Sequence, residues 1–563
     1  MDKLAIIVKI KEKRKIKISF PFDIITVNQV KEKILSRTYD KVNRVWYAPI
    51  CPHNIRMLKE LKFILSTELI NIQNKASQKK LPALNITGLK HKLYPFQKDG
   101  VAFIELNNGR ALIGDEMGLG KTMQALAYFW LHKEEIPIII VCPASLKYNW
   151  LQEIVEWLPI TENEIQVLSG KTIVSITKKI IIIINYDILS AWAIPLHKIA
   201  PKLLIYDECH FFKNSKSQRT KAVKKLSKGI KHIICLSGTP ILNRPNEIYN
   251  AVAIINNDIF ANYWKFAMRY CGPKHNGFGW AFNGATHTDE LNSILTENIM
   301  IRRLKKDVLK DLPDKTRTSV PMELNNLQEY MLAEHNFINW IKGDVKAKAE
   351  QALINARGDE YSMALQIDEK KVKELQDAKI SRINILTQIE VLKQLAVKGK
   401  LKSCTDWIDN FLDTDKKLVI FATHKFVIDY LMEKYKSIAV KIDGSVATNK
   451  RQDVVKAFQT NKKVRLFVGN IQAAGVGLTL TAASDVVFLE LPWSPALLEQ
   501  AEDRVHRIGQ KNAVNIYYLL AKDTIEEKIA KLISSKKAVL DMVLDGKEVE
   551  ETSLLNQLIK QII

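Results

Sequence analysis

The residues best suited to chemistry lie in the stretch 114–122, which reads GDEMGLGKT. An apolar run precedes it and a helix-like run follows it, so a strand enters a glycine-rich turn that opens a helix. Such a turn directs backbone N–H groups and the positive end of the helix dipole at one point, which suits a phosphate chain. Lys121 could then reach the β- and γ-phosphates, and Thr122 could hold Mg²⁺. Because the strict P-loop pattern has glycine where this chain has Asp115, a chance glycine turn stays open as an alternative.

A second group of reactive side chains follows the apolar run 203–206. Asp207 and Glu208 stand at the end of this predicted strand, ahead of His210. An acid there can hold Mg²⁺ through water, and the adjacent glutamate can position and deprotonate the water that attacks a γ-phosphate. Adjacent acids often mark a solvated turn. An apolar strand that ends in two acids downstream of a phosphate loop favours a nucleotide site.

Two arginines, Arg504 and Arg507, are the third candidate. We expect them one helical turn apart on one face of a helix. There, two guanidinium groups could neutralise the charge that develops on a γ-phosphate. The alternative is ion pairing with Glu499, Glu502 or Asp503, which is common at this helical spacing.

Two further motifs flank these residues. Gln97 lies just ahead of the glycine-rich turn, and its amide can donate and accept in one plane, as reading an adenine edge requires. The segment 236–240 reads LSGTP. Its hydroxyls could link the nucleotide site to movement of a second domain, although an ordinary exit from a strand would look the same.

The elements that must position these residues alternate buried runs with helical patterns, which predicts parallel sheets covered on both faces. Strand candidates in the first half lie at 111–113, 138–142, 180–184, 203–206 and 232–236. The rhythm resumes at 418–421, 439–442, 464–468, 486–489 and 514–519. In open α/β sheets ligands bind beyond the carboxyl ends of the strands, where these motifs stand. The second sheet lacks a phosphate loop and would supply the other face of a composite site.

The net charge of +23 on 563 residues favours a polyanionic partner, above all nucleic acid. No apolar run is long enough to span a bilayer, so we expect no membrane partner. We see no signal-peptide pattern, and six scattered cysteines predict no disulfide or zinc framework. The expected setting is intracellular, in the cytoplasm or nucleoid of a bacterium or phage host, or in a eukaryotic nucleus.

Residues 1–80 hold almost half of the excess charge, with 18 Lys and Arg against 7 Asp and Glu, a net of +11. Within this block Arg44 and its basic neighbours are interleaved with Tyr39 and Trp46. The charges could meet phosphates while the rings stack bases. A small β-hairpin whose aromatic residues form its own core is an equally good interpretation.

The motifs GDEMGLGKT, VCPASLKYNW, INYD, DECH, LSGTP and QAEDRVHRIGQ occur in the order of the Swi/Snf-type ATPases, a branch of the superfamily-two helicases and translocases, which this chain resembles over residues 93–524. The resemblance implies two RecA-like lobes that use ATP and Mg²⁺ on DNA, as a monomer. Cys209 stands where many members have alanine or glycine, and Trp150 is expected to pack in the core. The resemblance to this family implies a catalytic set of Lys121, Asp207, Glu208, Arg504 and Arg507. It also implies that Thr122 and Asp207 hold the metal ion through water. It implies nucleotide contacts by Gln97, Asp115, Glu116, Met117, Gly118, Leu119, Gly120, Lys121, Thr122, Gly475, Gly477 and Gln500.

The order S-R-x-Y-D…W near the amino terminus resembles the HARP module that accompanies annealing helicases. This similarity implies DNA recognition by Tyr39, Arg44 and Trp46. Arg302 and Arg303 resemble the family's basic element between the lobes, which implies a contact to the DNA backbone. A solvated basic helix face is the alternative.

These patterns predict an α/β protein with five parts: a basic HARP-like α+β module (1–80), RecA-like lobe 1 (81–313), a helical insertion (314–400), RecA-like lobe 2 (401–545) and a helical tail (546–563). Helices are expected at 327–342, 345–357, 369–378 and 380–396. We expect an ATP-dependent duplex-DNA translocase that anneals strands or remodels forks, acting on forked or branched DNA. A translocase that displaces proteins from DNA, with residues 1–80 on a protein partner, and a scaffold with an idle ATPase stay open.

Overall fold

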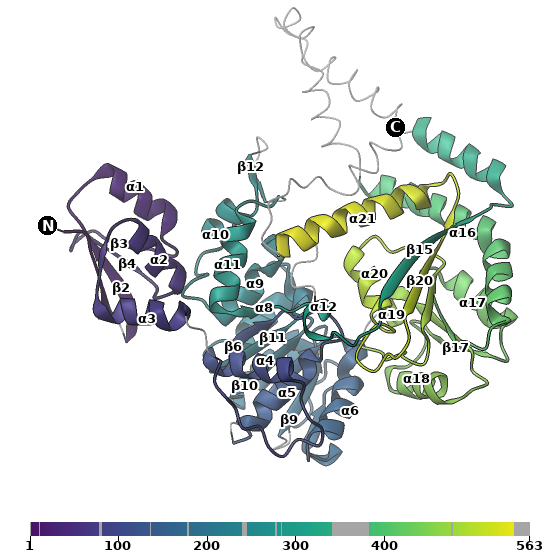
Figure 1. Cartoon of the computed structure of the whole chain (residues 1–563), viewed down its shortest axis with the longest axis horizontal. Coiled ribbons are helices and arrows are strands. Elements are labelled where there is room, and N and C mark those ends of the chain that lie inside the picture. Colours follow the sequence, from purple (N-terminus) through teal and green to yellow (C-terminus); the bar gives the residue numbers. More distant parts are fainter. Residues whose placement is uncertain are drawn as a thin grey trace, which may run out of the picture. The chain divides into compact units, whose positions relative to one another are not determined.

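The structure is a computed structural model that describes residues 2–10, 12–77, 81–134, 137–176, 180–238, 245–275, 279–282, 284–339, 382–474 and 477–544 (Figure 1). Contacts within the chain divide it into two compact units. The first holds the residues up to Leu312, and the second begins at Pro313. Each unit is built around its own parallel sheet.

The first unit opens with a small α+β module. Alternating apolar and basic residues form a sheet in the order β3-β4-β2-β1-β5, with antiparallel pairs except for β1 and β5. Its strands are β1 (Leu4–Ile10), β2 (Lys13–Ser19), β3 (Thr38–Asp40), β4 (Val45–Ala48) and β5 (Ile64–Leu65). Its helices are α1 (Ile24–Lys33), α2 (Pro52–Glu60) and α3 (Thr67–Ser77). Ile16, Ile18 and Val30 are fully buried in its core.

The main sheet of the first unit has the order β14-β6-β11-β10-β7-β9-β8, and all its pairs are parallel. Its strands are β6 (Arg110–Ile113), β7 (Ile138–Cys142), β8 (Ile165–Val167), β9 (Ile181–Asn185), β10 (Leu203–Asp207), β11 (His232–Leu236) and β14 (Met300–Ile301). The five strands expected here are confirmed. They are buried on both faces, as a parallel sheet covered by helices requires.

The helices that accompany this sheet are α4 (Pro95–Leu106), α5 (Lys121–Leu131), α6 (Lys147–Trp157), α7 (Leu189–Lys198), α8 (Gln218–Leu226), α9 (Tyr249–Ile255), α10 (Tyr263–Tyr270), α11 (Thr288–Asn298) and α12 (Lys305–Val308). An antiparallel ribbon, β12 (Pro273–His275) and β13 (Trp280–Phe282), follows α10.

The amino-terminal module is joined to the rest of the first unit by core packing and polar contacts. Cys51 belongs to the apolar core of the main sheet. Ser36 Oγ donates to the carbonyl of Ile259 at 2.5 Å, and Arg56 pairs with Glu297 at 2.6 Å. Residues 1–77 are therefore part of the first unit and not a separate body.

The second unit holds a sheet of order β15-β20-β19-β16-β18-β17, again parallel throughout. Its strands are β15 (Lys315–Met322), β16 (Leu418–Ala422), β17 (Ala439–Ile442), β18 (Leu466–Asn470), β19 (Asp485–Phe488) and β20 (Val514–Ala521). The five strands expected after residue 400 are confirmed. The helices are α16 (Arg382–Leu412), α17 (Lys425–Lys434), α18 (Arg451–Thr460), α19 (Ile471–Ala474), α20 (Pro495–Glu502) and α21 (Ile525–Leu544).

The expectation of helices alone over 314–400 is wrong at its start, because β15 is a strand paired with β20 along its whole length. Its sequence, KTRTSVPM, is exposed at most positions and lacks the apolar run that marks the other strands. A helix at 327–339 and α16 agree with the predicted helices, whereas 345–357 and 369–378 lie outside the described residues.

All six cysteines are free and buried, as their scattered spacing predicted. No described helix combines the length and the apolar character that a membrane crossing needs.

A partly buried histidine links two segments of the second unit. His424 Nε2 lies 3.0 Å from Glu390 of α16, and its Nδ1 faces Glu490, which follows β19. Glu490 also accepts the backbone N–H groups of Thr423 and His424. Hydrogen bonds to Glu390 and Glu490 raise the pKa of His424 to about 9, so the imidazolium is the favoured form in the folded chain.

This network predicts a pH-dependent stability. Because the folded pKa lies above the ordinary value of about 6.5, the charged histidine stabilises the fold below that value, and this contribution is lost as pH rises through about 9. The thermal midpoint of the parent should therefore exceed that of His424→Gln most at low pH, by an amount that corresponds to roughly 1–3 kcal/mol. Thermal unfolding of both chains across this range measures the difference. A difference that does not shrink with rising pH would contradict the assignment.

Candidate active site

The predicted reactive residues of the first unit meet beyond the carboxyl ends of neighbouring strands of its sheet. Strands β6, β11 and β10 are parallel neighbours, and their carboxyl ends lead into the glycine-rich turn, the LSGTP segment and the DECH segment. Gly238 lies directly beside the turn: a Cβ there would stand 2.3 Å from Met117 Cγ and 3.2 Å from Lys121 Nζ. The three motifs therefore form one site. Thr239 and Pro240 lie outside the described residues.

The glycine-rich turn has the backbone that its sequence predicts. Gly118 and Gly120 have φ angles of +85° and +76°, which residues with side chains rarely adopt. Gly120 is the N-cap of α5, and no side chain caps that helix. Lys121 Nζ donates to the carbonyls of Asp115 at 2.9 Å and Glu116 at 3.4 Å. The first N–H groups of α5 and the lysine ammonium thus converge on the turn, which suits an anion.

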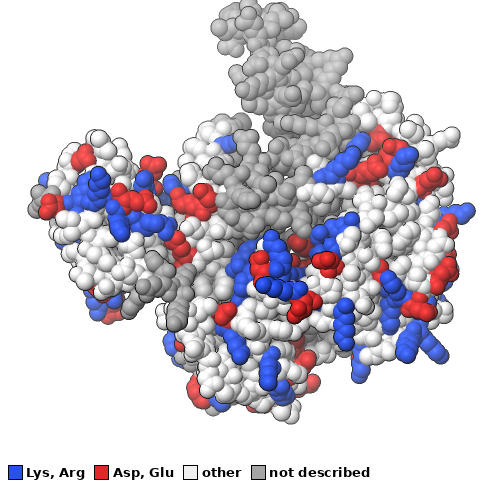
Figure 2. All heavy atoms as spheres, in the orientation of Figure 1, with Lys and Arg blue, Asp and Glu red and all other residues white. Residues whose placement is uncertain are grey.

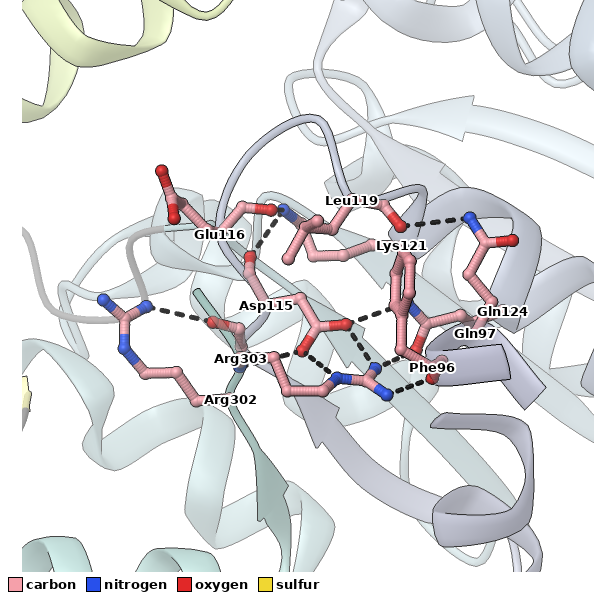
Figure 3. A network of polar contacts seen from close by, with 10 residues as sticks. Phe96, Gln97, Asp115, Glu116, Leu119, Lys121, Gln124, Arg302 and Arg303 are labelled. Atoms are coloured by element: carbon pink, nitrogen blue, oxygen red, sulfur yellow. Dashed lines mark hydrogen bonds and ion pairs between the residues drawn. The ribbon is translucent and has the colours of Figure 1, made fainter. Parts of the chain in front are cut away.

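Asp115, expected among the nucleotide contacts, instead fastens the turn from beneath (Figure 3). Its side chain is fully buried. It accepts Arg303 Nε at 3.0 Å, Arg303 Nη2 at 2.5 Å and Gln124 Nε2 at 2.9 Å. Arg303 also donates to the carbonyl of Phe96 and to Gln124 Oε1. A buried carboxylate needs such partners, and here they hold the turn to α4, α5 and the segment after β14.

The side chains of Arg302 and Arg303 have partners within the first unit, and their expected DNA contact stays a prediction. The guanidinium group of Arg303 pairs with Asp115, and the Arg303 side chain is 13% exposed. Arg302 Nη1 donates to the carbonyls of Gly114 at 3.0 Å and Gly238 at 3.4 Å. Both arginines therefore support the turn. The sequence offered one signal for this role. Asp115 stands where the P-loop pattern has glycine, and a buried acid requires a cationic partner.

Gln97 lies against the glycine-rich turn, as its position in the sequence suggested. Its Nε2 donates to the carbonyl of Leu119 at 3.1 Å, and its Oε1 accepts Tyr94 N–H at 3.0 Å. A Cβ on Gly120 would stand 2.4 Å from Gln97 Nε2, so glycine is required there for packing as well as for its φ angle. Its expected role at an adenine edge stays a prediction.

Asp207 and Glu208 occupy the end of β10. Trp150 Nε1 donates to Asp207 Oδ2 at 2.8 Å, and Glu208 N–H donates to Oδ1 at 2.9 Å. Burial raises the pKa of Asp207 to about 7, and the neighbouring Glu208 charge adds to the rise. Trp150 is buried, as expected, but it also orients the acid, a role that the sequence did not indicate.

Glu208 is linked to the LSGTP segment through His210. Glu208 has a left-handed φ of +49°, which turns its side chain away from the direction of β10. His210 Nδ1 lies 3.3 Å from Glu208 Oε2 and 3.4 Å from Ser237 Oγ. A movement of Ser237 can therefore alter the position of Glu208 through His210.

In the second unit, Arg504 and Arg507 do not lie on one helix face as expected. Helix α20 ends at Glu502, and both arginines lie in the turns that follow. Arg504 Nε donates to the carbonyl of Gln500 at 2.8 Å, and Arg507 Nη1 to that of Leu478 at 3.1 Å. Gly477 has φ +75°, and Gly475 lies outside the described residues.

The acids beside these arginines have strong cationic partners on β15. Lys315 lies 3.0 Å from both Glu502 and Asp503, and Arg317 lies 2.6 Å from Glu502. Although burial opposes the charge of Glu502, these cations hold its pKa at about 2. The strand that the sequence did not reveal thus anchors the end of α20.

The expected DNA residues of the amino-terminal module lie on a β-hairpin. Tyr39 and Trp46 are cross-strand partners whose ring centroids are 4.8 Å apart. Trp46 packs against the module core, whereas Tyr39 is 47% exposed and Arg44 is exposed in the turn. The predicted hairpin is present, although Tyr39 does not join its core, and the DNA contacts expected of Tyr39, Arg44 and Trp46 stay a prediction. Figure 2 shows Lys and Arg interspersed with Asp and Glu over this module.

Two family models match the chain. One, described as the SNF2-related domain, matches residues 96–395, and the other, the helicase conserved C-terminal domain, matches residues 399–509.

Individual proteins are similar over most of the chain. The SWI/SNF-related matrix-associated actin-dependent regulator of chromatin subfamily A-like protein 1 homolog of Caenorhabditis elegans is 34% identical over 549 residues, 94% of this chain and 74% of that protein. DNA annealing helicase and endonuclease ZRANB3 of Homo sapiens is 35% identical over 474 residues, 82% of this chain but 41% of that protein. The solved Sulfolobus solfataricus SWI2/SNF2 ATPase core in complex with dsDNA has 25% identity and a TM-score of 0.39, with 83% of this chain and 96% of that chain covered.

The Asp115–Arg303 pair predicts a large loss of stability when one partner is removed. Arg303→Met leaves a fully buried carboxylate uncompensated, which costs about 3–5 kcal/mol. Arg302→Met is the matched control, because it removes hydrogen bonds to carbonyls only, at about 1 kcal/mol. Thermal unfolding of the two variants should show the larger decrease for Arg303→Met, with part of it recovered in Asp115→Asn/Arg303→Met. Equal decreases in the two single variants would contradict this role.

Proposed function

Since this chain belongs to the SNF2-related family, we propose that it is a DNA-dependent ATP hydrolase that couples ATP turnover to movement along duplex DNA. The observation that carries the proposal is the convergence of Lys121, Asp207 and Glu208 on one sheet edge. The helix N-terminus at Gly120 and the Lys121 ammonium suit a triphosphate at this edge.

ATP and Mg²⁺ are the proposed cofactors, and the residues present fit them. Thr122 in the first turn of α5 and the oriented carboxylate of Asp207 would hold the ion through oxygen atoms and water. When bound, Mg²⁺ would neutralise charge on the β- and γ-phosphates. Lys121 binds the same phosphates, and Glu208 accepts a proton from the attacking water while His210 keeps its carboxylate in place.

For Arg504 and Arg507 of the second unit, we propose that they stabilise charge on the γ-phosphate during hydrolysis. Their backbone acceptors and the anchored end of α20 give both guanidinium groups fixed starting positions. This role of the two arginines is a prediction that turnover measurements can test.

We propose duplex, forked or branched DNA as the substrate, and strand annealing or fork remodelling as the outcome. The human relative named a DNA annealing helicase supports this choice. So do the net charge of +23 and the exposed Tyr39 and Arg44 of the hairpin. Displacement of proteins from DNA is the second candidate, in which the amino-terminal module would bind a protein.

Variants of the proposed catalytic residues should have separable defects. Lys121→Ala should lose ATP turnover and keep DNA binding, because the phosphates lose their cation. Glu208→Gln should bind ATP and stall, and Arg507→Ala should lower turnover with little change in ATP affinity. The measurement is ATP hydrolysis with no nucleic acid, duplex, single-stranded DNA, forked DNA and RNA at matched salt.

Each outcome of this experiment has a distinct meaning. Parent-like turnover in Lys121→Ala or Glu208→Gln would refute the assigned role, as would a large loss of ATP binding in Arg507→Ala. Stimulation by RNA alone would overturn DNA as the substrate. Stronger stimulation by forks than by plain duplex would support fork remodelling, and equal stimulation would favour protein displacement.

The annealing role should depend on the exposed hairpin. Deletion of residues 1–80 is a poor test, because Cys51 belongs to the core of the main sheet. Tyr39→Ala/Arg44→Ala instead removes an exposed ring and an exposed cation and should slow annealing of complementary strands about tenfold or more, at unchanged duplex-stimulated ATPase. Val42→Ala, 90% exposed in the same hairpin, is the matched control. Annealing as fast as that of the parent would remove the hairpin from the proposed function.

A further inference from the structure

An exposed aromatic cluster lies on α10 and the β12–β13 ribbon. Trp264 is 50% exposed and Trp280 is 44% exposed. Their ring centroids are 6.5 Å apart at 87°, and His275 lies 5.4 Å from Trp280. Two half-exposed tryptophans side by side are costly in water, so they are typical of a binding surface.

Other residues already anchor this ribbon to the first unit. Phe282 packs against the core of the main sheet and against Tyr263, at a centroid distance of 6.2 Å. Trp264 covers the Phe282 ring edge-on at 5.3 Å. The half-exposed portions of Trp264 and Trp280 are therefore not needed for this anchoring.

A basic pocket of about 330 Å³ adjoins the cluster, between α10 and the segment after α1. Its charged lining residues are Lys31, Glu32, Arg37, Lys265 and Arg269, and His287 also lines it. Glu290 neutralises Arg269 through two hydrogen bonds. Arg37 and Lys265 donate to backbone carbonyls, those of Ile34 at 2.9 Å and Arg37 at 3.3 Å.

The pocket thus gathers more positive than negative charge. Burial lowers the pKa of Arg37, and the nearby Arg269 charge adds to that effect. Burial likewise lowers the pKa of Lys265, together with the charge of Arg37. A bound anion would relieve this mutual repulsion, which makes the pocket complementary to a phosphate.

The aromatic cluster and the pocket are continuous on α10. Met268 lines the pocket and follows Trp264 by four residues, so the two share a helix face. Lys265 and Arg269, also four apart, form the adjacent face toward Arg37. A phosphate in the pocket would therefore lie next to a ring on which its own or a neighbouring base could stack.

We propose that α10 and the β12–β13 ribbon form a second nucleic-acid site, which binds single-stranded DNA by a phosphate in the pocket and a base stacked on Trp264 or Trp280. This inference rests on the proposed DNA-dependent function and adds a site to it. Unpaired strands expose base faces that a duplex hides, and aromatic residues beside cations are what such strands require. A translocase with this site would hold a displaced strand while its sheet edge hydrolyses ATP.

The test is the binding of a short fluorescent oligothymidine to the full chain, followed by anisotropy over a range of salt. Trp264→Ala and Trp280→Ala should each weaken binding on the order of tenfold with an unchanged salt slope. Lys265→Ala should weaken binding and reduce the slope of log K against log salt by about 0.7, as expected for one lost phosphate contact. Tyr430→Ala and Lys456→Ala, an exposed aromatic and an exposed lysine of the second unit, are the matched controls.

Parent-like oligothymidine binding in Trp264→Ala/Trp280→Ala would overturn the inference, as would an equal loss of binding to blunt duplex. Retained duplex-stimulated ATPase in each variant shows that the chain is folded and keeps this outcome separate from the proposed function. If the parent shows no such ATPase, the proposed function fails. Far-UV circular dichroism then reports folding, and the anisotropy series still tests the site.

Discussion

The buried Asp115–Arg303 pair is the constraint on which the first unit depends. A buried acid inside the glycine-rich turn is admissible only because a guanidinium from the segment after β14 pairs with it, and Gln124 donates a further hydrogen bond. The pair joins residues 188 positions apart. The turn therefore depends on a contact with a segment far away in the sequence, which links the site to the fold around it.

Polar partners also position the other candidate site residues. Trp150 fixes Asp207, and His210 connects Glu208 to Ser237. In the second unit Lys315 and Arg317 bind the acids that close α20, so that Arg504 and Arg507 follow a fixed end. In each case the side chain stands at or just beyond the end of a strand or helix, and a residue from another segment helps to set its position.

The sequence predicted five strands of each sheet because most of them are apolar runs, and such runs need no knowledge of tertiary partners. For the same reason it placed Asp207 and Glu208 at the end of β10 and Lys121 at the start of the helix that follows the glycine-rich turn. It did not predict β15, which is mostly exposed and becomes a strand only by pairing with β20. It did not predict the Asp115–Arg303 pair, and it wrongly placed Arg504 with Arg507 on a helix face, because partners such as Asp115 and Lys315 cannot be read from local spacing.

The shared core of the amino-terminal module and the first sheet has a mechanical consequence. Cys51, the Ser36–Ile259 hydrogen bond and the Arg56–Glu297 pair hold the module without relying on the polar segment near residue 80. A tethered domain would sample many positions, and its effect on a substrate would follow from a local concentration. A module that packs on the same core keeps one position instead. The distance from its hairpin to the glycine-rich turn is then set by packing, so a DNA junction bound at the hairpin would lie at a fixed distance from that turn.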